Sequence, residues 1–202
     1  ANGIMLDVDH GTYPFVTSSS PSIGGISTGT GLAPNKITDV IGIMKAYTTR
    51  VGSGPFPTEL KDILGDEIRE KGGEYGSTTG RPRRCGWFDA FVGKYAVMIN
   101  GITEINLTKL DVLTGIPKLK IAVAYKHGTR SLKSFPADPE IFQNLKVEYL
   151  EMPGWKEDLS KARKYADLPK NARAYVEKIE KLVGCKITSI GVGKNRNEMI
   201  FR

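Results

Sequence analysis

A short polar stretch from Ser77 to Arg84 combines hydroxyl side chains, a glycine and three arginines. Gly76 precedes the stretch, Gly80 lies inside it, and Pro82 restricts the turn. Arginine guanidinium groups bind carboxylate or phosphate through pairs of parallel hydrogen bonds, and hydroxyl and backbone N–H groups can complete the cage. The stretch therefore predicts a clamp for a small anion, and a solvent-exposed basic loop is the alternative interpretation.

The segment Thr108-Lys109-Leu110-Asp111 follows an apolar stretch and is close to the Asn-Lys-x-Asp pattern with which GTPases read guanine. An aspartate in this place accepts hydrogen bonds from guanine N1–H and from the exocyclic amine, whereas adenine presents the wrong donor pattern. We therefore predict a guanine contact at Lys109 and Asp111. A strand that ends in a charged turn is the alternative.

A glycine-marked segment from Ser189 to Lys194 follows a later strand, and its backbone amides could flank a base. Its spacing is not that of a phosphate-binding loop, and the pattern Gly-x-x-x-x-Gly-Lys-Ser/Thr does not occur in the 202 residues. If a nucleoside triphosphate is used, its phosphates must be held by groups outside this sequence.

The composition is that of an ordinary soluble globular protein, with 40% hydrophobic and 25% charged residues. The net charge of +7 suits a polyanionic partner or phosphorylated small substrates. The basic residues are spread along the chain without a long Lys/Arg run, which argues against a nucleic-acid-binding tail. No apolar run reaches membrane-spanning length, and we expect a cytosolic protein without membrane contact.

Two cysteines and two histidines, Cys85, Cys185, His10 and His127, form no metal-ligand motif. We therefore expect free thiols and no zinc site. Cys85 lacks a basic partner nearby in sequence, so a packed thiol is expected rather than a nucleophile. For His10, a general base and a hydrogen-bonded structural histidine are both open.

The elements that must position these residues alternate between strands and helices. Strands are expected at residues 4–9, 46–51, 104–109, 118–125, 130–133, 147–152, 186–192 and 198–201, and helices at residues 35–44, 58–72, 87–100 and 168–183. The alternation predicts an α/β layer structure, and no repeat or clear linker divides it, so one domain is expected. Because the sequence opens directly on residues 4–9 without a methionine or a flexible lead, we expect the back part of something longer.

Five stretches taken together resemble the adenylosuccinate synthetase family. They are residues 9–19, 50–59, 77–84, 108–111 and 152–155. They occur in the family's order with plausible spacing, and the resemblance runs nearly end to end but covers only the family's C-terminal half. It implies an α/β fold, a layered sheet with flanking helices, as the C-terminal part of a P-loop-NTPase-like synthetase fold. Residues 1–202 would then be the C-terminal portion of a single α/β domain whose N-terminal phosphate-loop half is absent.

The resemblance implies a GTP-dependent ligase of AMP biosynthesis in the purine pathway. IMP would be phosphorylated on O6 by GTP, and the amino group of L-aspartate would displace the phosphate of 6-phosphoryl-IMP to give adenylosuccinate. Mg²⁺ would be the cofactor, and the enzyme would be a cytoplasmic homodimer. The phosphate loop, the Mg²⁺ ligands and the catalytic aspartate and histidine would lie in the missing half, so we expect this chain alone to be inactive.

The resemblance also distributes residues among three ligands. Aspartate would contact Ser77, Thr78, Thr79, Gly80, Arg81 and Arg83. IMP would contact Asn2, Thr17, Val51 and Arg81, with the Asn2 amide near O6 and the transferred phosphoryl group. GTP would contact Arg83, Lys109, Leu110, Asp111, Ser189 and Gly191. No residue of this chain would be a metal ligand or, apart from the possible Asn2 contact, catalytic.

One small departure is Pro82, where many members of the family carry another arginine. It should stiffen the loop without removing its two key charges. A non-catalytic purine- or anion-binding relative is the alternative function, followed by a basic nucleic-acid-binding domain, whose affinity would fall steeply with salt.

Overall fold

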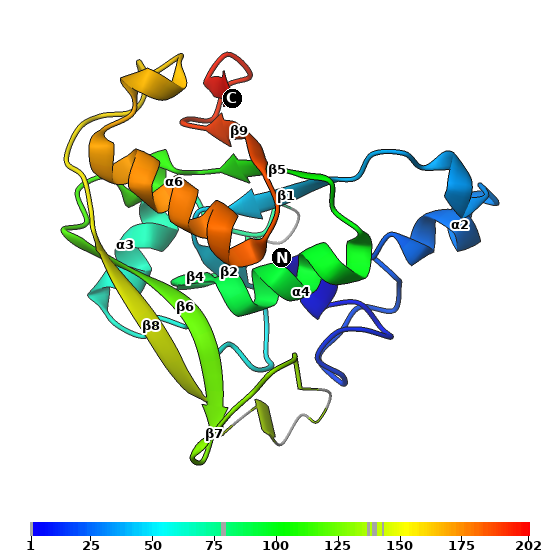
Figure 1. Cartoon of the computed structure of the whole chain (residues 1–202). Coiled ribbons are helices and arrows are strands. Elements are labelled where there is room, and N and C mark those ends of the chain that lie inside the picture. Colours follow the sequence, from blue (N-terminus) through cyan, green and yellow to red (C-terminus); the bar gives the residue numbers. More distant parts are fainter. Residues whose placement is uncertain (1, 78–79, 137, 139–140, 143) are drawn as a thin grey trace.

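The computed structural model describes residues 2–77, 80–136, 138, 141–142 and 144–202, which form sheets with flanking helices (Figure 1). The main sheet has the strand order β1-β5-β9-β10. Its strands are β1 (Ile41–Lys45), β5 (Glu104–Thr108), β9 (Ile187–Gly191) and β10 (Met199–Phe201). The first three run parallel, and β10 returns antiparallel to β9. The predicted α/β class with a layered sheet is therefore confirmed.

Two helices, α4 (Ala90–Asn100) and α6 (Lys170–Val183), pack on each other beside the main sheet (Figure 1). Gly93 permits the close approach, because a Cβ atom there would lie 2.9 Å from the Val183 side chain and 3.9 Å from the Met44 sulfur of β1. The apolar layer between helices and sheet is the core that holds the carboxyl ends of β5 and β9 in place.

The course of α6 follows its sequence closely. Pro169 precedes the first turn, and Gly184 ends the helix in the left-handed conformation. The buried face consists of Ala172, Tyr175, Val176, Ile179 and Val183. The Tyr175 hydroxyl donates a hydrogen bond to the Ala46 carbonyl at 2.8 Å, which ties α6 to the end of β1. No helix in the described part of the chain is both long and apolar enough to cross a membrane.

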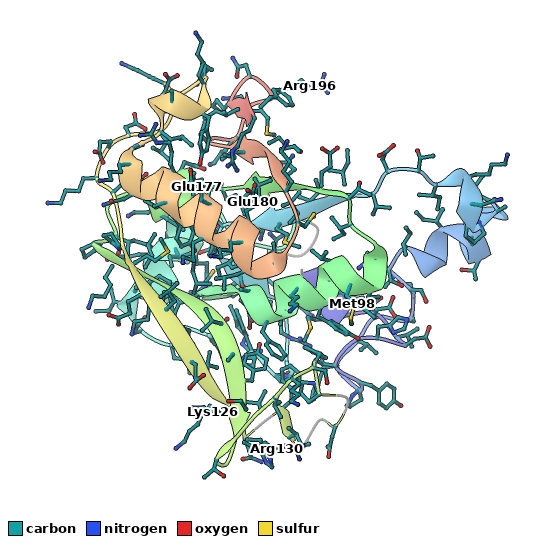
Figure 2. All side chains as sticks on the ribbon, viewed as in Figure 1. Met98, Lys126, Arg130, Glu177, Glu180 and Arg196 are labelled. Carbon is teal, nitrogen blue, oxygen red and sulfur yellow. The ribbon has the colours of Figure 1, made fainter. Side chains whose placement is uncertain are left out.

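A second sheet contains a long antiparallel ribbon of β6 and β8. Its strands are β4 (Phe88–Asp89), β6 (Lys118–His127), β7 (Arg130–Ser131) and β8 (Lys146–Pro153). Strand β4 runs parallel to β6, and β7 pairs with the end of β6 across a tight turn. Lys126 and Arg130 mark this turn at the tip of the ribbon, at the opposite end of the view from Arg196 (Figure 2).

A small two-stranded sheet joins the loops that carry the predicted site. Strand β2 (Thr48–Arg50) pairs antiparallel with β3 (Arg84–Gly86), and Arg50 stands opposite Arg84. Helix α3 (Ile63–Gly72) packs on β3 and ends at Gly73, which is left-handed. The short elements are α1 (Asn2–Met5), α2 (Gly24–Thr30) and the 3-10 turns η1 (Pro34–Lys36), η2 (Asp111–Leu113) and η3 (Tyr165–Asp167).

Most predicted elements are present with shifted ends. The strands predicted from residue 104 onward correspond to β5 to β10, and the three helices predicted from residue 58 onward correspond to α3, α4 and α6. Helix α3 begins late because the Leu60 N–H donates to the Cys85 carbonyl at 2.9 Å and Asp62 caps the helix instead. Helix α4 begins late because β4 pairs with β6.

The predicted strand at residues 4–9 is wrong. Helix α1 and a series of turns occupy this segment. Asp7 is fully buried, and its carboxylate accepts hydrogen bonds at 3.0 Å from the backbone N–H groups of Asp9, His10 and Ser22. This side chain satisfies backbone donors that a strand partner would otherwise bind, so the chain folds back here.

The predicted helix from Asn35 to Met44 is also wrong. Only η1 forms, and β1 begins at Ile41. The Val40 N–H donates to the Thr103 hydroxyl at 3.0 Å, which sets this segment beside the start of β5. The isoleucines and Met44 alternate with the period of a strand, and tertiary pairing with β5 outweighs the weak helical spacing.

Candidate functional site

A buried carboxylate, Glu74, follows the end of α3 and is fully enclosed. Its Oε2 accepts hydrogen bonds from Lys45 Nζ and Arg83 Nη1, both at 2.7 Å. Its Oε1 accepts one from the Tyr47 hydroxyl at 2.6 Å and lies 3.6 Å from Lys109 Nζ. Arg83 of the predicted anion clamp and Lys109 of the predicted guanine contact therefore meet at one carboxylate.

The charge state of this cluster is set by opposing effects. Burial acts to raise the pKa of Glu74, but hydrogen bonds from Lys45, Tyr47 and Arg83 outweigh it and hold the pKa at about 2. Burial lowers the pKa of Lys45 although Glu74 opposes this, and burial and Glu74 raise the pKa of Tyr47. Glu74 is thus ionised at neutral pH and faces three cationic side chains.

The loop with the first two arginines is built on a backbone stem. The Arg83 N–H donates to the Glu74 carbonyl, and the Gly76 N–H donates to the Arg81 carbonyl, both at 2.8 Å. The Gly80 N–H donates to the Gly76 carbonyl at 2.8 Å, and Gly80 has a positive φ of 65° that suits glycine. These hydrogen bonds join residues 74–76 to residues 80–83, and Ser77 and Arg81 lie where this stem leads into the tip of the loop.

At this tip, Ser77 and Arg81 are exposed. No carboxylate of the described residues pairs with the Arg81 guanidinium. The predicted aspartate contacts Thr78 and Thr79 lie outside the described residues. The loop thus offers one uncompensated guanidinium beside hydroxyl and backbone groups, as an anion clamp requires.

Arg84, the third arginine of the stretch, has a different role from a clamp. Its Nε and Nη2 donate to the two carboxylate oxygens of Glu59, both at 2.6 Å. Its Nη1 donates to the carbonyls of Gly52 and Gly54 at 3.1 and 2.9 Å. Because every nitrogen of this guanidinium has a protein partner, Arg84 fastens the turn at residues 52–54 and does not contribute to the anion clamp.

The predicted guanine turn lies where β5 ends beside β9. Lys109 has a positive φ of 60°, and the Leu110 N–H donates to the Gly191 carbonyl at 3.1 Å. Ser189 lies on the same strand as Gly191 and is nearly buried. The Asp111 Oδ1 atom is buried and has no hydrogen-bond partner among the described residues. Burial raises the pKa of Asp111, and the charge of Lys109 opposes this shift.

The predicted IMP contacts Thr17 and Val51 belong to two loops that a buried arginine joins. Arg50 is 3% exposed, and its Nη2 donates to the Thr12 hydroxyl at 3.0 Å and to the Phe15 carbonyl at 2.9 Å. Burial and the nearby Arg84 charge lower the pKa of Arg50 to about 10. The loop that leads to Thr17 is therefore fixed to the strand that leads to Val51.

A pocket of about 210 Å³ lies where α1 meets β1, β2 and the end of β5. Its lining includes Gly3, Lys45, Thr49 and Thr108. The Lys45 Nζ atom also donates to the Thr49 hydroxyl at 2.8 Å. Asn2 precedes Gly3 in the first turn of α1. The backbone near the predicted IMP contact Asn2 and the residue before Lys109 therefore border the same pocket.

Three residues of the cluster were missed by sequence reasoning, namely Lys45, Tyr47 and Glu74. The signal that could have identified Glu74 is its place between glycines, seven residues before Arg81, where a cluster of arginines favours a nearby carboxylate. The packed-thiol interpretation of Cys85 is confirmed, since the thiol is fully buried and burial raises its pKa to about 11. His10 is exposed, its backbone N–H donates to the Asp7 carboxylate, and its backbone carbonyl accepts a hydrogen bond from the Tyr95 hydroxyl.

The comparisons with known proteins agree on one family. Residues 1–200 match the family described as adenylosuccinate synthetase. The chain is 57% identical over 199 residues to the chloroplastic adenylosuccinate synthetase 2 of Oryza sativa, covering 98% of this chain and 41% of that protein. It is 56% identical over 201 residues to the adenylosuccinate synthetase of Geotalea daltonii, covering 100% of this chain and 47% of the relative.

A solved structure gives the same result. The structure of fully ligated adenylosuccinate synthetase from Plasmodium falciparum matches with a TM-score of 0.96 at 46% identity, over 98% of this chain and 48% of the other. The chain thus spans less than half the length of each of these relatives.

Proposed function

The chain belongs to the adenylosuccinate synthetase family, and from this premise we propose that it is the C-terminal portion of a GTP-dependent ligase that joins IMP and L-aspartate to form adenylosuccinate. The reaction passes through 6-phosphoryl-IMP and belongs to AMP biosynthesis. Residues 1–202 form one part of a single α/β domain, and this part alone is inactive.

The observation that carries the proposal is the unpartnered Oδ1 atom of Asp111. A buried acceptor without a donor costs free energy, and guanine offers two adjacent donors, N1–H and the exocyclic amine, that satisfy a carboxylate. Lys109, Leu110, Ser189 and Gly191 surround this place in the sequence and in the sheet. We assign these five residues to guanine.

The anion loop supports the aspartate assignment. The Arg81 guanidinium is exposed and unpaired among described side chains, while Arg83 is held by Glu74 and retains further N–H groups. We assign the aspartate carboxylates to Arg81, Arg83 and the loop residues Ser77, Thr78, Thr79 and Gly80. Arg81 also contacts the IMP ribose, and Arg83 also faces GTP.

The IMP assignment rests on the loops that Arg50 joins. Thr17 binds the IMP phosphate and Val51 lies against the ribose, while Asn2 reaches the O6 region of the base. The pocket bordered by Gly3 and Thr108 supports this arrangement, because it connects the backbone next to Asn2 with the guanine turn. In this scheme the chain orients three substrates and supplies no nucleophile.

The cofactor that we propose is Mg²⁺. The described residues include no group of three His, Cys, Asp or Glu side chains that could hold a metal ion, so these residues do not fit the ion and they carry no step through it. We also propose a homodimer. The bacterial relatives favour a cytoplasmic enzyme, although the rice relative is named chloroplastic.

A hybrid enzyme tests the function. This chain replaces the matching 201 residues of the Geotalea daltonii synthetase, with which it is 56% identical. We expect the purified hybrid to form adenylosuccinate only when GTP, Mg²⁺, IMP and aspartate are all present, as measured by mass spectrometry, and the 202-residue chain alone to form none. A folded hybrid that binds guanine nucleotide but forms no product would instead identify a non-catalytic binding relative.

A further inference from the structure

We infer that Glu74 is a positioning residue that couples the anion loop to the guanine turn. It binds Arg83 on one side and Lys109 on the other, so that one buried carboxylate sets the geometry of two ligand contacts. The inference rests on the proposed function, because it assigns Glu74 to the aspartate and GTP sites of that enzyme. It concerns a residue that itself contacts no substrate.

The partners of Glu74 come from separate parts of the chain. Lys45 ends β1, Lys109 follows β5, and Arg83 precedes β3. The carboxylate follows α3, so no local turn explains why these cations converge. Their convergence fixes the anion loop against the edge of the main sheet where the guanine turn lies.

Positively charged side chains outnumber carboxylates in the cluster around Glu74. Lys45, Arg83 and Lys109 face the one fully buried carboxylate of Glu74, so positive charge is in excess among these four side chains, and Asp111 acts on Lys109 from the side of the guanine turn. Like charges at this separation repel, and the low dielectric of the interior strengthens both the repulsion and the attraction to Glu74. Without the carboxylate, Arg83 and Lys109 would move apart.

The cations also keep unused hydrogen-bonding capacity. Arg83 gives only Nη1 to Glu74, and no other described acceptor binds its side chain. Lys109 Nζ donates to the Gly72 carbonyl as well as facing Glu74. Arginine has five N–H donors and lysine three, so each side chain can bind Glu74 and a ligand at once.

The Arg84–Glu59 pair shows what a purely structural ion pair looks like in the same chain. There one guanidinium meets one carboxylate with both oxygens used, and the remaining nitrogen binds two backbone carbonyls. Lys61 Nζ also lies 4.0 Å from the Glu59 carboxylate, but the Arg84 guanidinium is closed, because each of its nitrogens has a protein partner. In the Glu74 cluster Arg83 keeps N–H donors that bind no described acceptor, which is the arrangement expected for anion binding.

The test is Glu74→Gln in the hybrid enzyme. Glutamine keeps the size but loses the charge and one acceptor, so we expect the KM for aspartate and the KM for GTP each to rise by roughly tenfold or more, and the KM for IMP to stay within about twofold. The control is Glu180→Gln on α6 (Figure 2), whose carboxylate binds Arg202 and the Ile187 N–H. It should lower the melting temperature without changing any KM.

A double-mutant cycle provides the second arm and keeps Glu74 intact. Arg83→Ala and Lys109→Ala are combined in the hybrid, and the KM for GTP is measured. Residues in one network give non-additive effects, so we expect the double variant to lose clearly less than the product of the two single losses.

The outcomes separate the two proposals. Activity of the unmutated hybrid decides the function. Equal rises of all three KM values in Glu74→Gln, unchanged KM values, or additive effects in the cycle would overturn the coupling. Titration of the 202-residue chain with GDP adds a readout without turnover, in which Glu74→Gln should weaken binding by roughly tenfold and Glu180→Gln should not.

Discussion

At the scale of single residues, the proposed guanine contact Asp111 carries a cost in folding stability. A buried carboxylate oxygen without a donor destabilises the fold, and burial raises the pKa of this group. Such a group is retained where a ligand completes its hydrogen bonds. Arg81 is the complementary case, a guanidinium that no described carboxylate neutralises.

Asp111→Asn should separate binding from stability. The amide presents an N–H donor where guanine also presents donors, so we expect GDP affinity to fall by roughly 10- to 100-fold in calorimetric titration. Xanthosine diphosphate, which has a carbonyl in place of the amine, should bind the variant better than GDP does. The melting temperature of the chain should stay equal or rise, because a buried unpaired charge is removed.

The matched control is Asp158→Asn, an exposed carboxylate that accepts hydrogen bonds from the N–H and the hydroxyl of Ser160. It should leave nucleotide affinity unchanged. Unaltered GDP affinity in Asp111→Asn would remove Asp111 from the base site.

Gly72→Ala tests how closely the Glu74 cluster is packed. A Cβ atom at Gly72 would lie 2.3 Å from the Tyr47 hydroxyl oxygen and 3.1 Å from Glu74 Cγ. Although alanine favours helices, we expect this change to lower the free energy of unfolding in urea by about 1–3 kcal/mol.

Tyr47→Phe removes the obstructing oxygen and should partly rescue Gly72→Ala. Gly29→Ala in α2 is the control, because a Cβ atom added there would meet no atom within 4 Å. It should be neutral or slightly stabilising. A Gly72→Ala variant as stable as Gly29→Ala would show that the cluster can move without cost.

At the scale of elements, one carboxylate joins α4 to the second sheet. Asp89 caps α4 by accepting the Val92 N–H at 3.1 Å, and its other oxygen accepts a hydrogen bond from the Tyr125 hydroxyl of β6. Burial raises the pKa of Asp89 to about 6, against the hydrogen bonds from Tyr125 and Val92. The junction thus carries a penalty for ionisation.

This penalty gives a pH dependence with a defined sign. The folded-state pKa of about 6 exceeds the reference value of 3.8, so the folded state binds the proton more readily and stability rises as the pH falls from about 6 toward 3.8. Glu74 acts in the opposite direction, because its pKa of about 2 lies below 4.5 and its contribution is lost only as the pH falls below about 4.5.

Asp89→Asn should isolate the first effect. Asparagine still caps the helix but does not titrate, so thermal unfolding at pH 7, 6 and 5 should show the wild-type chain gaining about 1 kcal/mol relative to the variant between pH 7 and pH 5. Parallel profiles of the two proteins would contradict the raised pKa.

Elements with a clear period or cap were predictable from sequence, and those fixed by tertiary contacts were not. Helix α6 begins after a proline, ends at a glycine and carries an apolar stripe. The side chains of the β6–β8 ribbon alternate between its two faces, and turns bound the strands. β1 was predicted as a helix because its strand register comes from pairing with β5. The residues of the candidate site divide in the same way between local motifs and tertiary contacts. The arginine loop and the Lys109–Asp111 turn carry local motifs, whereas the convergence on Glu74 depends on three segments that only the fold brings together.

At the scale of the whole molecule, the main sheet has an uncovered apolar strip. Ile41 and Ile43 on β1 are 57% and 60% exposed, and among described strands β1 pairs only with β5. Parallel sheets normally have both faces covered, and an apolar edge strand invites pairing with another chain. The chain spans 41% of the rice relative and 48% of the Plasmodium falciparum protein.

Ile43→Lys should therefore act in opposite directions in two contexts. In the 202-residue chain, a lysine on the exposed edge should suppress self-association, and sedimentation should show a larger monomer fraction. In the hybrid enzyme, where we expect the remaining residues of the relative to cover this strip, the same lysine would be buried without a partner and should lower the melting temperature. Ile63→Lys, at the exposed start of α3, is the control for added charge and should do neither. If Ile43→Lys leaves the hybrid as stable as Ile63→Lys does, the strip stays open in the complete enzyme and its isoleucines need another explanation.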